Sequence, residues 1–270
     1  MLSIRPAAVA GMFYPEAPAA LAADIQAYLG KAVAPATAAT WPKALIVPHA
    51  GYVYSGPIAA SAYRRLAAHA DAIRRVVLFG PTHRVAMQGL ALPSARAFAT
   101  PLGVVEIDTD AVASALTLAQ VRKSDAAHAL EHSLEVQLPF LQTVLGQFRI
   151  VPFAVGDASA VQVAEVIELL WNDPGTLVIV SSDMSHYLRY SEARALDRAT
   201  ADSVLALSAT LHGEQACGAI PVNGLLVAAR RRGLRPELID LRNSGDTAGD
   251  KSRVVGYAAF AFTEAGHDRS

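Results

Sequence analysis

Four short apolar runs along the chain each end abruptly in a polar cluster. They cover residues 44–47, 76–79, 150–155 and 177–180 and are rich in Val, Ile and Leu. Runs of this kind predict strands that are buried on both faces. Other stretches predict seven helices, over 17–29, 59–70, 110–119, 133–145, 161–171, 192–207 and 223–232, and further strands over 234–241 and 254–263. Strands that alternate with helices predict a single α/β domain over residues 1–270, with a mainly parallel central sheet and helices on both faces.

The composition narrows the class of protein. Of the residues, 53% are apolar and 17% are charged, and the net charge is −1, which is typical of a well-packed enzyme-like chain without a basic face for nucleic acid. No apolar run reaches the ~18 residues of a membrane span, and residues 1–16 lack the apolar region of a signal peptide. A single cysteine, Cys217, excludes an internal disulfide and fits a reducing cytoplasm.

Two histidines follow the first two apolar runs within a few residues. His49 lies after the run 44–47, and His83 lies after the run 76–79. Ligands of open α/β sheets sit outside the carboxyl ends of the strands, so we expect both histidines at a site, as metal ligands. His and carboxylate ligands suit iron(II), zinc, copper or manganese, and two histidines with one carboxylate suit non-heme iron. The alternative is that each histidine only caps a strand by hydrogen bonding.

Further polar residues could complete this site. Asp183 and His186 follow the fourth run, three residues apart, so Asp183 could ligate or orient while His186 acts as an acid or base. Asp183 could equally be a simple helix N-cap. His132, flanked by two glutamates, could act in a second shell, bind substrate, or merely begin a helix. The four other histidines, 69, 128, 212 and 267, are expected on the surface.

Two segments nearer the C-terminus are weaker candidates for residues of the site. Residues 242–250 follow another predicted strand and gather Asp246, a second carboxylate and two glycines, which could supply a metal ligand, an anion nest or only a solvated turn. A lone cysteine such as Cys217 is more often a small buried apolar residue than a nucleophile or a ligand.

Seven motifs in order along the chain resemble those of the Memo family, the "B" protein of the AmmeMemoRadiSam system. They lie at residues 5–6 with 10–15, 48–56, 80–83, 131–139, 181–186, 217–218 and 256–259. The resemblance implies the fold of class III extradiol dioxygenases with a pocket at the strand ends. It also implies that His49 and His83 match two metal ligands, and that Asp183 and His186 match pocket residues that do acid/base work.

One position departs from the family pattern. In the animal members a cysteine near the C-terminal strand completes the metal set. Counting back from residues 256–259, that place falls near Thr247, which is a poor ligand. Asp246 or Asp183 is expected to substitute for it, whereas Cys217 is assigned to a different motif.

The function expected first is that of a dioxygenase-like redox enzyme. Iron(II), or else zinc or copper, would be held by His49 and His83 with Asp183 or Asp246, while His186, Asp183 and His132 serve catalysis. The alternative is an adaptor without turnover, which binds a small molecule, a peptide or a metal, or holds no metal at all. The system that the family belongs to implies its protein A and a radical SAM protein as partners. A third hypothesis for the function is metal-assisted hydrolysis.

Overall fold

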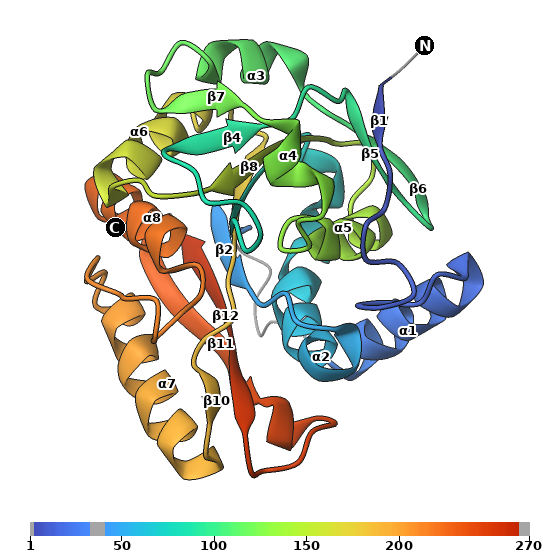
Figure 1. Ribbon diagram of the computed structural model, residues 1–270, viewed down its shortest axis with the longest axis vertical. Coiled ribbons are helices and arrows are strands. Elements are labelled where there is room, and N and C mark those ends of the chain that lie inside the picture. The colour runs from blue at the N-terminus through green and yellow to red at the C-terminus, as the bar shows by residue number, and fades with distance from the viewer. Residues whose placement is uncertain (1–2, 33–40, 265–270) are drawn as a thin grey trace, which may run out of the picture.

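The four apolar runs form four adjacent parallel strands at the centre of the sheet. The computed structural model describes residues 3–32 and 41–264 (Figure 1). The central strands stand in the order β2 (Ala44–Val47), β9 (Thr176–Ser181), β3 (Arg75–Pro81) and β8 (Arg149–Val155). All three pairings between them are parallel. The α/β class and these buried strands are therefore confirmed.

The outer strands make the sheet mixed. In the described residues the main sheet has nine strands, and β12 (Val254–Thr263) runs antiparallel to β2 while β4 (Leu90–Leu92) runs antiparallel to β8. A short connection joins β11 (Arg235–Asn243) to β12, and two strands joined in this way can only pair antiparallel. The remaining strands are β10 (His186–Leu188) beside β12 and β7 (Val121–Lys123) beside β4. The parallel part of the sheet is thus limited mainly to its centre.

Helices cover both faces of the sheet (Figure 1). On one side lie α1 (Pro18–Lys31), α2 (Tyr52–Tyr63) and α5 (Leu138–Val144), and on the other α6 (Ala160–Leu170), α7 (Tyr190–Leu205) and α8 (Ala219–Arg232). Two short helices, α3 (Thr109–Ala115) and α4 (Asp125–Ala129), and a small sheet of β1 (Ile4–Arg5), β5 (Ala97–Thr100) and β6 (Gly103–Glu106) complete the structure. None of the described helices is both long and apolar enough to cross a membrane.

Two predicted helices differ from the observed ones. The helix expected from residue 59 begins earlier, at Tyr52, and continues past Tyr63 as the 3-10 helix η1 (Arg64–Ala72). The helix expected from residue 133 is a 3-10 turn, η2 (Glu135–Gln137), followed by α5. The residues before η2 form a loop instead, because their backbone groups are hydrogen-bonded to side chains of the site described below.

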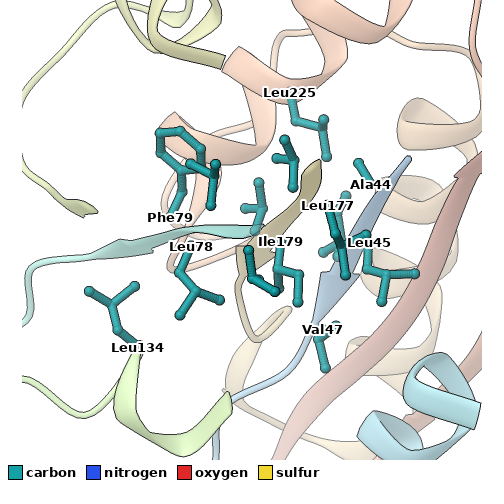
Figure 2. Packing of buried hydrophobic residues seen from close by; sticks show 14 of the residues in the cluster. Ala44, Leu45, Val47, Leu78, Phe79, Leu134, Leu177, Ile179 and Leu225 are labelled. Carbon is teal, nitrogen blue, oxygen red and sulfur yellow. The ribbon is translucent and has the colours of Figure 1, made fainter. Parts of the chain in front are cut away.

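The core is built from the two faces of the central strands (Figure 2). Side chains of β2, β3 and β9 pack against Leu225 of α8 and against Leu134, and all of them are buried. The rings of Phe79 and Phe153 stack on neighbouring strands with their centroids 4.9 Å apart. Helix α8 packs so closely on α6 that a Cβ at Gly224 would lie 2.4 Å from Val163. This packing holds the carboxyl ends of the central strands in fixed positions.

The carboxyl ends of β2, β9 and β3 meet at one edge of the sheet. His49 lies two residues beyond β2, Asp183 two beyond β9 and His83 two beyond β3. Because these strands are neighbours and parallel, the three loops lie side by side, as the sequence predicted.

Candidate metal centre

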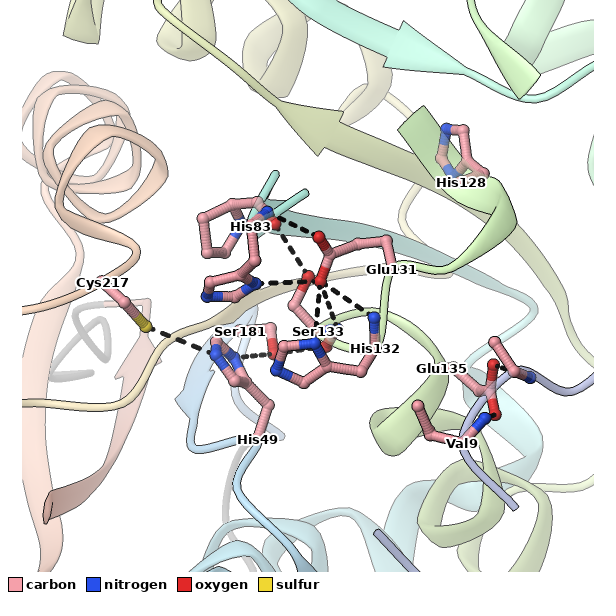
Figure 3. A network of polar contacts seen from close by, with 12 residues as sticks. Val9, His49, His83, His128, Glu131, His132, Ser133, Glu135, Ser181 and Cys217 are labelled. Carbon is pink, nitrogen blue, oxygen red and sulfur yellow. Dashed lines mark hydrogen bonds and ion pairs between the residues drawn. The ribbon is translucent and has the colours of Figure 1, made fainter. Parts of the chain in front are cut away.

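Three histidine rings converge at this edge (Figure 3). His49, His83 and His132 each offer one ring nitrogen, and these nitrogens lie within 4.8 Å of one another. The ring centroids are 5.3 Å apart for His49 and His83 and 4.6 Å apart for His83 and His132. His132 comes from the loop between α4 and η2, so the structure adds a third histidine to the pair that the strands deliver. His49 is buried, while one side of His83 is exposed.

The proton on the His49 ring can be assigned from its neighbours. Nδ1 of His49 lies 2.9 Å from Ser181 Oγ. That hydroxyl donates its only proton to the carbonyl of Ser133, at 2.6 Å, and accepts from Gln137 Nε2, at 2.7 Å. Nδ1 of His49 must therefore be the donor in their contact, because the hydroxyl has no second proton to give. The lone pair of Nε2 is left free and faces the cluster.

Glu131 orients the other two rings. Its Oε1 lies 2.9 Å from His83 Nδ1 and 3.3 Å from His132 Nδ1. The same carboxylate accepts from the backbone N–H groups of His83, at 2.6 Å, and of His132 and Ser133, both at 2.9 Å. A carboxylate can only accept, so Nδ1 of His83 carries a proton, and Nε2 is the nitrogen of that ring left to face a metal. A histidine that ligates a metal is usually held by a partner of this kind.

The charges of the site favour neutral rings beside an ionised carboxylate. Burial, followed by the neighbouring His83, lowers the pKa of His49 to about 3, and burial also lowers the pKa of His132 to about 4. Burial alone would raise the pKa of Glu131, but hydrogen bonds from His83 and Ser133 outweigh it and hold that pKa at about 2. At neutral pH, His49 and His132 therefore keep their lone pairs available, as a ligand must.

Cys217 lies next to His49, which the sequence did not predict. Its Sγ is 3.3 Å from His49 Nε2 (Figure 3). The next residue, Gly218, allows this approach, since a Cβ there would be 2.7 Å from the Cβ of Ser182, just beyond β9. Burial raises the pKa of the thiol to about 12, so the metal-free thiol is protonated. The expectation that set Cys217 apart from this site is wrong; a cysteine–glycine pair directly before a helix was the available signal.

Asp183 and His186 border the cluster without joining it. Asp183 is buried, its Oδ1 accepts the backbone N–H of His49 at 2.7 Å, and burial raises its pKa. His186 begins β10, half-buried, and its charge acts on the Asp183 carboxyl. Among the described residues, the three histidines alone group closely enough to share an ion, so the structure does not place Asp183 among the metal ligands.

The structure gives Asp246 and Thr247 a different environment. Asp246 accepts from Tyr190 Oη at 2.6 Å and from the backbone of Asn243 at 3.0 Å, and Thr247 donates to Ser244 at 3.2 Å. These bonds shape η3 (Ser244–Asp246), the turn between β11 and β12. β12 pairs with β2 over residues 260–262 but with β11 as far as residue 256, so the turn projects beyond the end of β2. Neither residue reaches the histidines.

Of the histidines expected on the surface, His128 is buried. It lies on α4 (Figure 3). Its Nε2 donates to the carbonyl of Ala91 at 2.9 Å, and its ring packs against that of Phe98 with the centroids 5.9 Å apart. The prediction failed because α4 packs its inner face over β4. His212 is exposed and His69 half-buried, while His267 lies outside the described residues.

We expect the His128→Gln variant to be less sensitive to acid than the wild type. Burial lowers the pKa of His128 from 6.5 to about 4. Between these values the unfolded chain binds a proton at this position and the folded chain does not, so the contribution of His128 to stability falls as the pH falls. Glutamine still donates to Ala91 but does not titrate. Urea unfolding at pH 7 and pH 4.5 measures the difference; an unchanged pH dependence, equal to that of the exposed-site control His212→Gln, would contradict this.

Comparisons with known proteins cover nearly the whole chain. A family model described as Memo-like protein matches residues 5–261. A MEMO1 family protein of Archaeoglobus fulgidus is 39% identical over 269 residues, which covers 94% of this chain and 97% of the relative. A MEMO1 family protein of Methanopyrus kandleri is 37% identical over 280 residues, covering 96% and 98%. One from Aquifex aeolicus is 35% identical over 273 residues, covering 97% and 100%.

Proposed function

The chain belongs to the Memo family. We propose that it is a dioxygenase-like redox enzyme that binds a divalent transition metal, with iron(II) as the preferred ion. His49 and His83 are the proposed ligands, His132 completes the cluster, and Cys217 lies beside His49. One observation carries the proposal: ring nitrogens of three histidines converge within 4.8 Å, and hydrogen bonds with Ser181 and Glu131 orient the rings of His49 and His83.

The donor set fits such a metal. Imidazole nitrogens suit iron, zinc and copper, and a thiolate adds preference for the softer ions. Burial of the Cys217 thiol does not oppose this, because coordination deprotonates a thiol. Once bound, iron(II) would supply Lewis-acid and redox chemistry to the site. The carboxylate ligand that the dioxygenase resemblance implied is absent from the cluster, and Cys217 lies beside His49 instead.

The protein's own residues are suited to orient the site and to move protons. Asp183 fixes the backbone of His49 and so aims its ring. We assign proton transfer to His186, which lies half-buried beside that carboxylate at the rim of the site. His132, whose ring packs against Phe13 with centroids 4.6 Å apart, is held too firmly by Glu131 to move far and serves binding.

Metal content tests this proposal. Protein purified without oxygen is expected to hold about one iron per chain by mass spectrometry, and His49→Ala and His83→Ala are each expected to lose it. His212→Ala, at an exposed histidine, is the matched control and should keep the metal. Loaded with cobalt(II), the wild type should show a thiolate charge-transfer band that Cys217→Ser lacks. A wild type that stays metal-free after reconstitution would exclude the redox function.

A second candidate function, an adaptor that binds a peptide or another ligand without turnover, is favoured by apolar side chains near the same centre. Met12 is 72% exposed and Tyr187 63% exposed, and each adjoins a residue of the site, Phe13 or His186. Such side chains would give a bound peptide or another ligand apolar contacts beside the centre. Oxygen uptake with any substrate would argue against this second function, whereas ligand binding by metal-free protein would argue for it.

A further inference from the structure

A cavity lies between α7 and the end of β11, and it is separate from the histidine cluster. Its volume is about 470 Å³, within the range of sites for small molecules. One wall is formed by the first two turns of α7, from Tyr190 to Arg198, and the other by Leu241, Arg242 and Asn243 of β11. None of the three clustered histidines lines it. A ligand in this cavity would therefore be independent of the metal proposed above.

Two arginines on α7 face this cavity without a carboxylate partner. Arg194 and Arg198 are one helical turn apart, and both are exposed. Within residues 3–32 and 41–264, neither forms an ion pair. Like charges one turn apart on a helix repel each other, so this arrangement destabilises the empty helix and would be relieved by an anion. Arg242 on the opposite wall is different, because its guanidinium binds Asp240 at 2.9 and 2.6 Å.

The two carboxylates of the cavity are already engaged. Asp197 accepts the backbone N–H of Ser185 at 3.0 Å and is packed against Gly256, where a Cβ would lie 2.0 Å from its oxygen. Asp246 accepts from Tyr190 Oη and from the backbone of Asn243. Neither compensates the two arginines of α7. The cavity therefore presents free cations rather than a neutralised network.

Other groups of the cavity suit the rest of a ligand. Asn243 uses its Oδ1 to accept from Gly245, so its amide N–H groups remain as donors. The ring of Tyr190 is flanked by two cations, with Lys251 Nζ 4.5 Å and the Arg194 guanidinium 5.7 Å from its centroid. Together with Leu241, that ring offers an apolar surface. Guanidinium groups match the geometry of phosphate, which they bind through two parallel hydrogen bonds.

We propose that this cavity binds a small phosphomonoester. Arg194 and Arg198 would bind its phosphate group, and Tyr190 and Leu241 would contact its organic part. The cavity lies next to the loop of the metal centre, because Asp197 holds Ser185, the residue before His186.

Calorimetric titration with phenyl phosphate, at low salt and with EDTA-treated protein, tests the site. The wild type is expected to bind with a Kd of about 1 mM or tighter, and Arg194→Ala and Arg198→Ala are each expected to weaken binding about fivefold or more. Arg122→Ala, at an exposed arginine of β7, is the matched control and should bind as the wild type does. Inorganic phosphate should bind more weakly than phenyl phosphate, because it lacks the ring.

Four results would overturn the proposal. They are no binding by the wild type at about tenfold the expected Kd, an equal loss in Arg122→Ala, equal affinity for inorganic phosphate, or loss of binding in His83→Ala. The last would place the phosphate at the histidines instead. Circular dichroism of each variant shows whether it is folded. If an alanine variant is not, Arg194→Lys and Arg198→Lys replace it, and weaker binding by these is the supporting result, since lysine keeps the charge without the two parallel bonds.

Discussion

Replacing Glu135 with alanine is expected to lower the free energy of unfolding by about 3–5 kcal/mol. Glu135 is fully buried and forms an ion pair with Arg5, which is buried as well. It also accepts from the backbone N–H groups of Ala8 and Val9, at 2.8 and 3.0 Å, and from Tyr14 Oη at 2.5 Å. Alanine would leave the buried charge of Arg5 without a counter-ion, and the backbone N–H groups of Ala8 and Val9 and the Tyr14 hydroxyl without their acceptor. Urea unfolding followed by circular dichroism measures the loss.

The double variant Arg5→Met/Glu135→Leu is the control for this prediction. It removes both charges, so it should be more stable than Glu135→Ala, although the donors of residues 8, 9 and 14 stay unpaired. The segment that Glu135 holds carries Phe13, whose ring packs on His132. Glu135→Ala should therefore also be cleaved faster by chymotrypsin after Phe13. A loss of less than about 1 kcal/mol, the size expected for one exposed pair, would show that the pair is not the anchor of this segment.

The central strands and two of the three histidines could be predicted from the sequence. A strand buried on both faces must be apolar throughout, so its end is visible where the apolar run stops. His49 and His83 follow such ends directly. Because β2, β9 and β3 are parallel neighbours, both histidines come to the same edge of the sheet. The antiparallel pairing of the outer strands was harder to predict from the sequence, because β12 pairs with β2, a segment more than 200 residues away.

The remaining parts of the site come from segments whose position depends on the folded structure. Glu131 and His132 lie in a loop that Arg5, from the start of the chain, fixes through the carbonyls of His128 and Glu131 at 2.9 and 2.7 Å. Cys217 approaches His49 because Gly218 permits contact with Ser182. The pattern of residues along the chain does not reveal either of these two contacts. The protons on Nδ1 of His49 and His83 could not be predicted from the sequence either, because their assignment depends on the acceptors Ser181 and Glu131, which contact them only in the folded chain.

Replacing Glu131 with glutamine is expected to weaken metal binding about 10- to 100-fold. The carboxylate accepts from four N–H groups, one of which is Nδ1 of His83, and its Oε1 also lies 3.3 Å from Nδ1 of His132. An amide has one accepting oxygen and places its own N–H groups against donors that cannot accept. Either the rings turn or their backbone shifts, and in both cases their Nε2 atoms no longer converge.

Zinc(II) titration against a competing chelator measures this loss, at a temperature where circular dichroism shows each variant to be folded. Glu106→Gln, at an exposed glutamate of β6, is the matched control and should bind as the wild type does. Because Glu131 acts partly through His83, the double variant Glu131→Gln/His83→Ala should lose less affinity than the sum of the two single losses. Additive losses would show that the carboxylate contributes to affinity directly and does not merely orient the ring. Affinity within about twofold of the wild type, well short of the loss expected for such a partner, would mean that the rings keep their geometry without it.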